Sequence, residues 1–351
     1  MQDRVRGRSE TERDGGGHCT PGLWCGRSRL VRWLGALGLA LGVVACSEPL
    51  APPLTVGINT WVGYDPLVLA RDRGLTDARQ VKVVELISSA EALRHLRNGL
   101  LDAAGLTLDE ALRLVDSGFD VRIVALLDTS AGADLVLAAP HITSLQKLRG
   151  EHIAVEDATV GTLMLERLLR KAGLRQEDVT VVRMEATQHL TALRSDRVAA
   201  AVSYAPIDGP IRALGYRPIF DSRQMPGEIV DVLVVRTEVL RQRPEAVDAL
   251  LAAWAGGLNL MQLDPPGAAA SLAPGADLSP AQYQAVLRGL RFYSPAESLA
   301  LLTGGPPGVA RQGQDVARLL VELGLLRQAP NWAALIDTAP AARARTTGPL
   351  P

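Results

Sequence analysis

The pattern of hydrophobic and polar positions begins, in the body of the chain, with a strand followed directly by a helix. Residues 54–58 alternate between large apolar and small or polar side chains, which predicts a strand with one buried face. A loop with two aromatic residues and a glycine follows, and a helix is predicted with Asp65 as N-cap and Pro66 as its first residue. Open α/β sheets bind ligands beyond the carboxyl ends of strands. We therefore interpret residues 61–65 as one wall of a ligand cleft; the alternative is a turn whose aromatic side chains only cover the end of the sheet.

Strands and helices continue to alternate as far as residue 235, which is typical of an α/β protein with a mainly parallel sheet. The remaining predicted strands are 81–87, 101–106, 121–127, 135–139, 152–156, 179–184, 198–202 and 229–235. The predicted helices between them are 90–98, 108–115, 145–148, 160–172 and 188–194, the last four with Thr107, Ser144, Thr159 and Thr187 as N-caps. Beyond residue 244 only helices are predicted, at 244–263, 280–290 and 314–326, and the tail at 338–351 is predicted to be disordered.

Two parts of the chain resemble each other at an offset of 97 positions, with residues 96–97 matching 193–194 and residues 101–104 matching 198–201. A chain of 351 residues is long enough for two lobes. The repeat therefore suggests two similar lobes that face each other, and a cleft between lobes is a usual place for a ligand.

The first 45 residues have the pattern of an export leader. Arginines at 27, 29 and 32 precede an apolar run at 34–45, which is short for a membrane span and suits a signal-peptide core. The sequence VVAC at 43–46 resembles a bacterial lipobox, so we expect residues 1–45 to be a lipoprotein signal peptide and Cys46 to carry lipid. An ordinary secretory signal and a short membrane anchor are the alternatives. Residues 46–53 would form a tether, and the mature body would have no disulfide.

Composition and charge narrow the possible partners. The chain is 47% hydrophobic and 21% charged, with a formal net charge of −1, so no nucleic-acid partner is implied. No P-loop, GxSxG, HExxH or CxxC motif is present, and the histidines are scattered. The acid pairs at 109–110 and 156–157 fall in predicted first turns or loops, where the helix dipole accounts for them. We expect no catalytic residue, no metal and no cofactor.

Five segments between residues 54 and 263 together resemble one family. The segments LTVGINTWVGYDPLVLARDRGL, VVELISSAEALRHLRNGLLDAAGLTLDEAL, LDTSAGADLVLAAP, LRGEHIAVEDATVGTLMLERLL and MPGEIVDVLVVR are similar, in this order, to periplasmic substrate-binding proteins of nitrate/sulfonate/taurine-type (NitT/TauT) ABC transporters. The resemblance implies an α/β bilobal periplasmic-binding-protein fold of type II, with two parallel or mixed sheets and C-terminal helices. Its hinge crossings are expected near 138–141 and 225–229. The first lobe would then comprise 54–139 and 228–337, and the second 140–227.

The resemblance also implies which residues line the cleft. Carried over to this sequence, the ligand-binding positions are Trp61, Gly63, Tyr64, Thr107, Asp109, Ser130, Gly132, Glu156, Thr159, Gly161, Thr162, Tyr204 and Glu228. The chain departs from the family at Ala199 and Ala205, where members often carry a carboxylate.

The candidate loops are rich in carboxylates and contain almost no lysine or arginine. The acids are Asp65, Asp109, Glu110, Asp128, Asp134, Glu156, Glu228 and Asp231. The aromatics Trp61, Tyr64 and Tyr204 could stack on a heteroaromatic ring or hold an ammonium group. A small amine-bearing or heteroaromatic ligand, such as a pyrimidine precursor of thiamine, is therefore favoured over nitrate or a sulfonate.

The function implied is that of an exported, lipid-anchored monomer in the periplasm or cell envelope, which captures a small molecule and delivers it to an ABC permease. One alternative is a ligand-sensing lipoprotein that feeds a membrane signalling protein. The other is a cofactor-biosynthesis enzyme on the same fold, although such relatives carry a cysteine-rich motif that the mature body lacks.

Overall fold

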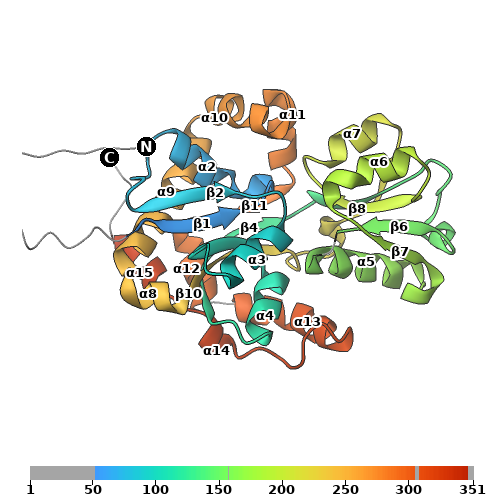
Figure 1. Ribbon diagram of the computed structural model, residues 1–351. Helices are drawn as coiled ribbons and strands as arrows, with labels where there is room; N and C mark the ends of the chain where they lie inside the picture. Colours follow the sequence, from blue (N-terminus) through green and yellow to red (C-terminus); the bar gives the residue numbers. More distant parts are fainter. Residues whose placement is uncertain (1–51, 157, 305–307, 347–351) are drawn as a thin grey trace, which may run out of the picture. The chain divides into compact units, whose positions relative to one another are not determined.

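The computed structural model describes residues 52–156, 158–304 and 308–346 (Figure 1). The predicted leader, Cys46 and most of the tether lie outside these residues, as does the end of the tail. Residues from Pro52 onward form one compact unit, which contains two separate sheets.

The first sheet has six strands in the order β11-β4-β10-β3-β1-β2. Their bounds are β1 Leu54–Ile58, β2 Val81–Glu85, β3 Ala103–Thr107, β4 Val121–Ser130, β10 Val230–Arg236 and β11 Leu290–Phe292. Strand β1 pairs in parallel with β2 and β3, whereas β10 is antiparallel to both β3 and β4, and β11 is antiparallel to β4. The sheet is therefore mixed. We call this sheet and its helices the first lobe.

The second sheet has five strands in the order β7-β6-β8-β5-β9. Their bounds are β5 Asp134–Ala138, β6 His152–Val155, β7 Thr180–Arg183, β8 Ala200–Tyr204 and β9 Arg217–Asp221. Strand β6 is parallel to β7 and β8, and β5 is antiparallel to β8 and β9. This sheet and its helices form the second lobe, so the predicted α/β bilobal architecture is confirmed.

Helices connect and cover the strands (Figure 1). In the first lobe before the crossing they are α2 Asp65–Asp72, α3 Ser89–Arg97 and α4 Leu108–Asp116. In the second lobe they are α5 Thr159–Ala172, α6 His189–Arg194 and α7 Asp208–Ala213. After β10 follow α8 Thr237–Gln242, α9 Pro244–Leu263, α10 Pro265–Leu272, α11 Pro280–Leu287, α12 Pro295–Leu302, α13 Val309–Glu322, α14 Trp332–Leu335 and α15 Ala339–Thr346.

The chain passes between the two sheets twice. The sequence places the first crossing near 138–141, but the structure places it at 131–133, because β4 belongs to the six-stranded sheet and β5 already belongs to the other. The expectation was wrong because the polar sequence of residues 128–134 predicts a loop, whereas β4 continues into this stretch as far as Ser130. The return passage lies at 222–229, between β9 and β10, and includes the predicted segment 225–229.

Several predicted helix ends are shifted. Asp65 is the first residue of α2 and Tyr64 is its N-cap, because the Asp65 carboxylate is engaged by the Tyr283 hydroxyl instead of the helix N-terminus. Thr159 is likewise the first residue of α5. Thr187 lies within a 3₁₀ turn before α6. Thr107 does occupy the N-cap position of α4, as predicted.

The C-terminal part departs from the all-helical prediction. Leu290–Phe292 forms β11 on the edge of the first sheet, so helix α11 ends earlier than expected. In the described portion of the tail, residues 339–346 form α15, which packs on α9 and is not disordered. An apolar contact surface for this short helix was not visible in its Ala- and Arg-rich sequence.

Helix α9 is the only helix of the described residues long and apolar enough to cross a membrane. It packs on α2 with its Gly257 against the main chain of Pro66, and half of its most apolar stretch is buried in the protein. These contacts are those of a core helix.

Candidate ligand site

Strand polarity brings the candidate loops of the first lobe to one edge of its sheet. Strands β1, β2 and β3 run in parallel, so the segments after Ile58, Glu85 and Thr107 leave at the same edge. Strand β10 is antiparallel to β3, and its start therefore lies there too, with Asp231 opposite Thr107. In the second lobe, antiparallel pairing sets Asp134 opposite Tyr204.

These loops enclose a cavity of about 30 Å³, room for one or two water molecules. Its walls come from both lobes and are Asn59, Trp61, Tyr64, Ser89, Thr107, Asp134, Glu156, Val160, Tyr204, Ile229 and Asp231. The rings of Trp61 and Tyr204 meet edge to face across the cavity, with centroids 5.9 Å apart. An Asx turn, in which the Trp61 N–H donates to Asn59 Oδ1 at 3.0 Å, fixes the start of the Trp61 loop.

Two carboxyl groups face each other behind this wall. Asp128 on β4 is the cross-strand partner of Asp231 on β10, and both side chains are buried. The Tyr64 hydroxyl donates to Asp231 Oδ1 at 2.6 Å, and the Trp61 indole N–H reaches Asp128 Oδ1 at 3.4 Å. Gly63 lies directly beside the pair, since a Cβ there would be 2.3 Å from Asp128 Oδ2.

Burial raises the pKa of the carboxyl groups at this site. The pKa of Asp231 is raised well above its ordinary value by desolvation and then by the charge of Asp128, so Asp231 carries a proton that it shares with Asp128. Desolvation also raises the pKa of Asp134 to about 7 and, with the Asp109 charge as the second cause, that of Glu110 to about 8. The cluster is therefore partly protonated at neutral pH when no cation is present.

Several oxygens of these acids are buried and accept no hydrogen bond from any described residue: Asp128 Oδ2, Asp134 Oδ2 and Glu110 Oε1. An unpaired buried acceptor costs on the order of 1–3 kcal/mol. Within the described ranges, no group of three or more His, Cys, Asp or Glu side chains is arranged to hold a metal ion.

The structure brings together five of the thirteen predicted ligand positions at the cavity itself, Trp61, Tyr64, Thr107, Glu156 and Tyr204. Gly63 and the buried Asp109 lie just behind them.

The remaining predicted positions have other surroundings. Thr159 accepts a hydrogen bond from Arg113 at 3.1 Å, and Thr162 accepts one from Arg183 at 3.0 Å. Ser130 shares a hydrogen bond with Ser222, and Gly161 packs against Val155. Glu228 forms an ion pair with Arg167 at 2.7 Å, so its charge is neutralised by a neighbour on α5.

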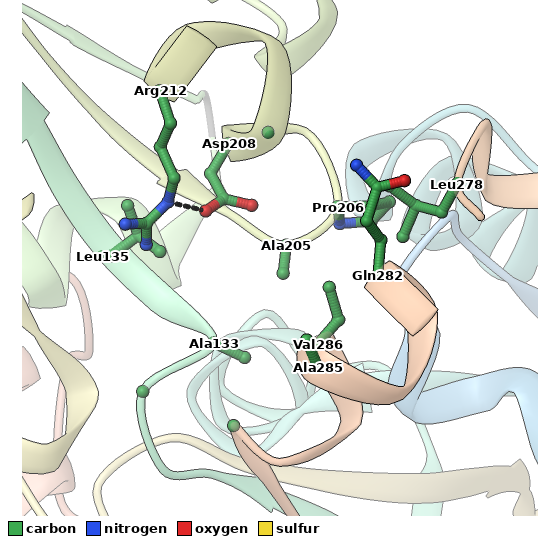
Figure 2. A pocket seen from close by; sticks show the side chains of 13 residues that line it. Ala133, Leu135, Ala205, Pro206, Asp208, Arg212, Leu278, Gln282, Ala285 and Val286 are labelled. Atoms are coloured by element: carbon green, nitrogen blue, oxygen red, sulfur yellow. Dashed lines mark hydrogen bonds and ion pairs between the residues drawn. The ribbon is translucent and has the colours of Figure 1, made fainter. Parts of the chain in front are cut away.

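Gly132 lies at a different pocket, which Figure 2 shows, between α7 and α11. There Arg212 and Asp208, joined by an ion pair, stand on one wall, and Gln282 and Leu278 stand on the other. The N–H of Gly132 donates to Ser222 Oγ at 2.7 Å, and its φ of 119° favours glycine, so this residue shapes the crossing between the lobes.

Sequence reasoning missed six cavity residues: Asn59, Ser89, Asp134, Val160, Ile229 and Asp231. The two aspartates were recognisable as acids in candidate loops, but their direction depends on strand register. The sequence does contain a signal for Asn59 and Ser89, since Asn59 directly follows one predicted strand and Ser89 comes two positions after another; their side chains are hydrogen-bonded at 2.8 Å.

Two sheets of this topology, joined by two crossings and enclosing a cavity lined from both lobes, define a type II periplasmic-binding-protein fold. The chain belongs to the NMT1-like family, whose sequence profile matches residues 47–274. The resemblance to the nitrate/sulfonate/taurine type of binding protein is thereby confirmed at the level of family and fold.

Curated relatives share part of the chain. Proteins described as binding proteins in Brucella abortus, Brucella suis and Brucella melitensis are 30% identical over 150 residues, which is 40% of this chain. The match spans 45% of the length of those relatives.

Solved structures share the fold. The periplasmic aliphatic sulphonate binding protein SsuA from Escherichia coli superposes with a TM-score of 0.68 at 18% identity, over 83% of this chain and 93% of SsuA. The desulfurization enzyme DSZB superposes with a TM-score of 0.60 at 17% identity, over 84% of this chain and 99% of DSZB. The fold thus serves both solute-binding proteins and an enzyme.

Proposed function

We propose that this protein is an extracytoplasmic solute-binding protein that captures a small amine-bearing or heteroaromatic cation between its lobes and delivers it to an ABC permease. The observation that carries the proposal is the pair of acids that line the aromatic cavity, Asp134 and Asp231, with the buried Asp134 Oδ2 accepting no hydrogen bond from any described residue. A ligand with several N–H donors would satisfy these acceptors, and its positive charge would stabilise the ionised acids.

The aromatic side chains support the same ligand class. Trp61 and Tyr204 present ring faces and edges at the cavity, and Tyr64 lies beneath them against Asp231. An ammonium or a protonated heterocycle gains cation–π attraction from such rings, most of all when water is excluded. A sulfonate or nitrate would instead meet the Asp134 carboxyl, whose ionised form repels an anion.

The proposed cycle is hinge closure. A cavity of about 30 Å³ is too small for a ring-sized ligand, so ligand entry requires the walls to separate and then close around it. Ligand that contacts both lobes shifts the population toward the closed form. The closed form would dock on a permease, and lipid on Cys46, which lies outside the described residues, would hold the monomer at the membrane.

The proposal assigns no chemical step to the chain. Within the described residues, the cavity wall contains no histidine, cysteine or lysine to pair with the hydroxyls of Ser89 or Thr107. Sharing a fold with an enzyme does not supply such a group.

The test begins with native mass spectrometry of the gently purified protein, followed by calorimetry with matched panels of amines, pyrimidines and sulfonates. We expect binding of a cationic compound, weakened at least tenfold by Asp134→Asn and unchanged by Asp315→Asn, an exposed acid on α13. If only sulfonates bind, the ligand class is wrong.

The lipid anchor is tested separately. The Cys46→Ser variant should be released from the membrane fraction; if it stays there, the protein has another anchor.

A further inference from the structure

A second cavity adjoins the first and has the opposite charge. Its volume is about 350 Å³, and it is lined by Arg94 and Arg97 from α3, Arg113 from α4 and Thr159 from α5. Thr159 and Glu110 line this cavity, while Val160 in α5 and Thr107, the N-cap of α4, line the ligand cavity. We call it the arginine pocket.

The three guanidinium groups form no ion pair with a described carboxylate, although the charge of Arg113 lowers the pKa of Asp109. Within the described residues, none of them lies within 4.0 Å of a carboxylate, whereas most other arginines of the protein form such pairs. Arg97 donates to Ser117 Oγ at 3.2 Å and Arg113 to Thr159 Oγ1 at 3.1 Å, which leaves most of their N–H donors available. Guanidinium groups recognise oxyanions through charge-assisted hydrogen bonds, and three of them line this one pocket.

From this arrangement we propose that the arginine pocket binds an oxyanion group, namely the carboxylate, sulfonate or phosphate at the far end of a ligand whose cationic part occupies the ligand cavity. The claim that one ligand occupies both cavities rests on the proposed function, whereas the claim that the arginine pocket binds an oxyanion does not.

The surroundings favour an oxyanion in two further ways. Helix α5 has 14 residues, and its first residue, Thr159, lines the pocket, so the positive end of the helix dipole lies at the pocket wall and favours an anion. Glu110 is the one acid that the described residues place on the wall. Its pKa is raised to about 8 by burial and then by Asp109, which reduces the negative charge that it presents to an anion at pH 7.

The position of the pocket gives the anion a mechanical role. Helices α3 and α4 belong to the first lobe and α5 belongs to the second, and the Arg113–Thr159 hydrogen bond already joins them. An oxyanion held by all three helices would add contacts that exist only when the lobes are together. It would therefore favour the same closed form as the cation.

The experiment uses inorganic sulfate as probe, titrated into the purified protein at pH 7 and constant ionic strength and followed by NMR. We expect saturable binding that weakens about tenfold in Arg94→Gln, which removes a guanidinium from the pocket wall, and further in the Arg94→Gln/Arg97→Gln double variant. Arg311→Gln, which replaces an exposed arginine on α13, is the matched control and should bind sulfate as the wild type does.

Equal sulfate affinity in all variants would mean an adventitious ion only. A titration that shows no saturation up to 100-millimolar sulfate would also overturn the site, because a Kd of 100 mM corresponds to a binding free energy of only roughly −1.4 kcal/mol. Sulfate binding that depends on Arg94, together with no cationic ligand, would leave the arginine pocket standing and refute the proposed function. Binding of a cationic ligand without binding of sulfate would refute the arginine pocket and leave the proposed function standing.

Discussion

Replacing Asp134 by asparagine should stabilise the unliganded protein while weakening its ligand affinity. Asp134 is buried at the cavity, and its Oδ2 has no hydrogen-bond partner among the described residues. Desolvation raises its pKa from 3.8 to about 7, with a further rise from Asp109 and an opposing hydrogen bond with Ser130. The carboxylate is thus held in an unfavourable place in the absence of a cation.

The sign and size of the effect follow from proton linkage. Between pH 4 and 7 the folded protein holds this proton more tightly than the unfolded chain, so the wild type loses stability as pH rises through that window. The difference between 3.8 and about 7 corresponds to at most about 4 kcal/mol, since each pKa unit is 1.36 kcal/mol. The amide of the Asp134→Asn variant does not titrate. Entry of water reduces the effect, so we expect the variant to be more stable by about 1–3 kcal/mol at pH 8 and equal to the wild type at pH 4.

Urea denaturation at pH 4, 6 and 8 measures the difference in unfolding free energy between the variant and the wild type. Taking this difference cancels the contribution of the other acids that titrate in the same pH range. Asp315→Asn, which removes an exposed acid, should change none of the three values appreciably. The reasoning is refuted if Asp134→Asn has the same stability relative to wild type at every pH, or is less stable at pH 8 than at pH 4.

Three other substitutions separate packing from binding. Gly257→Ala would put a Cβ 1.8 Å from a carbonyl oxygen of α2, so we expect a loss of about 1–3 kcal/mol in urea denaturation; an unchanged midpoint would contradict the tight α2–α9 contact. Tyr64→Phe removes the hydroxyl that donates to Asp231 at 2.6 Å and should cost about 1–3 kcal/mol at pH 7, whereas wild-type stability would show that water replaces the bond. Trp61→Phe should abolish most of the ligand-induced change in tryptophan fluorescence; a retained signal would place the ligand elsewhere.

Much of the fold could be predicted from the sequence because strand and helix periods are local. Helix α9 begins at Pro244 and ends at Leu263, as the bracketing prolines predict. Strand β11 could not be found in this way: three residues carry no period, and Leu290–Phe292 becomes a strand only because the edge of β4 is available.

The site was predicted in its aromatic part and less well in its polar part. Trp61 and Tyr64 sit in a loop with a clear local signature, so they were found. The opposition of Asp128 and Asp231 depends on a register shift between β4 and β10, which no local pattern reveals. The acidic character of the loops was visible, but which acids face the cavity was not.

The position of β10 has a consequence for the order of events during folding. This strand lies between β3 and β4 in the first sheet, yet the whole second lobe precedes it in the chain, and Thr129 on β4 is hydrogen-bonded to Ile229, 100 positions later. Both sheet neighbours of β4 arrive only after residue 229. A growing chain therefore cannot close its first sheet until most of its length has been made, because the non-local pairing comes last. Until β10 is made, the facing edges of β3 and β4 stay unpaired, whereas the five strands of the second lobe, contiguous in the sequence, are already complete.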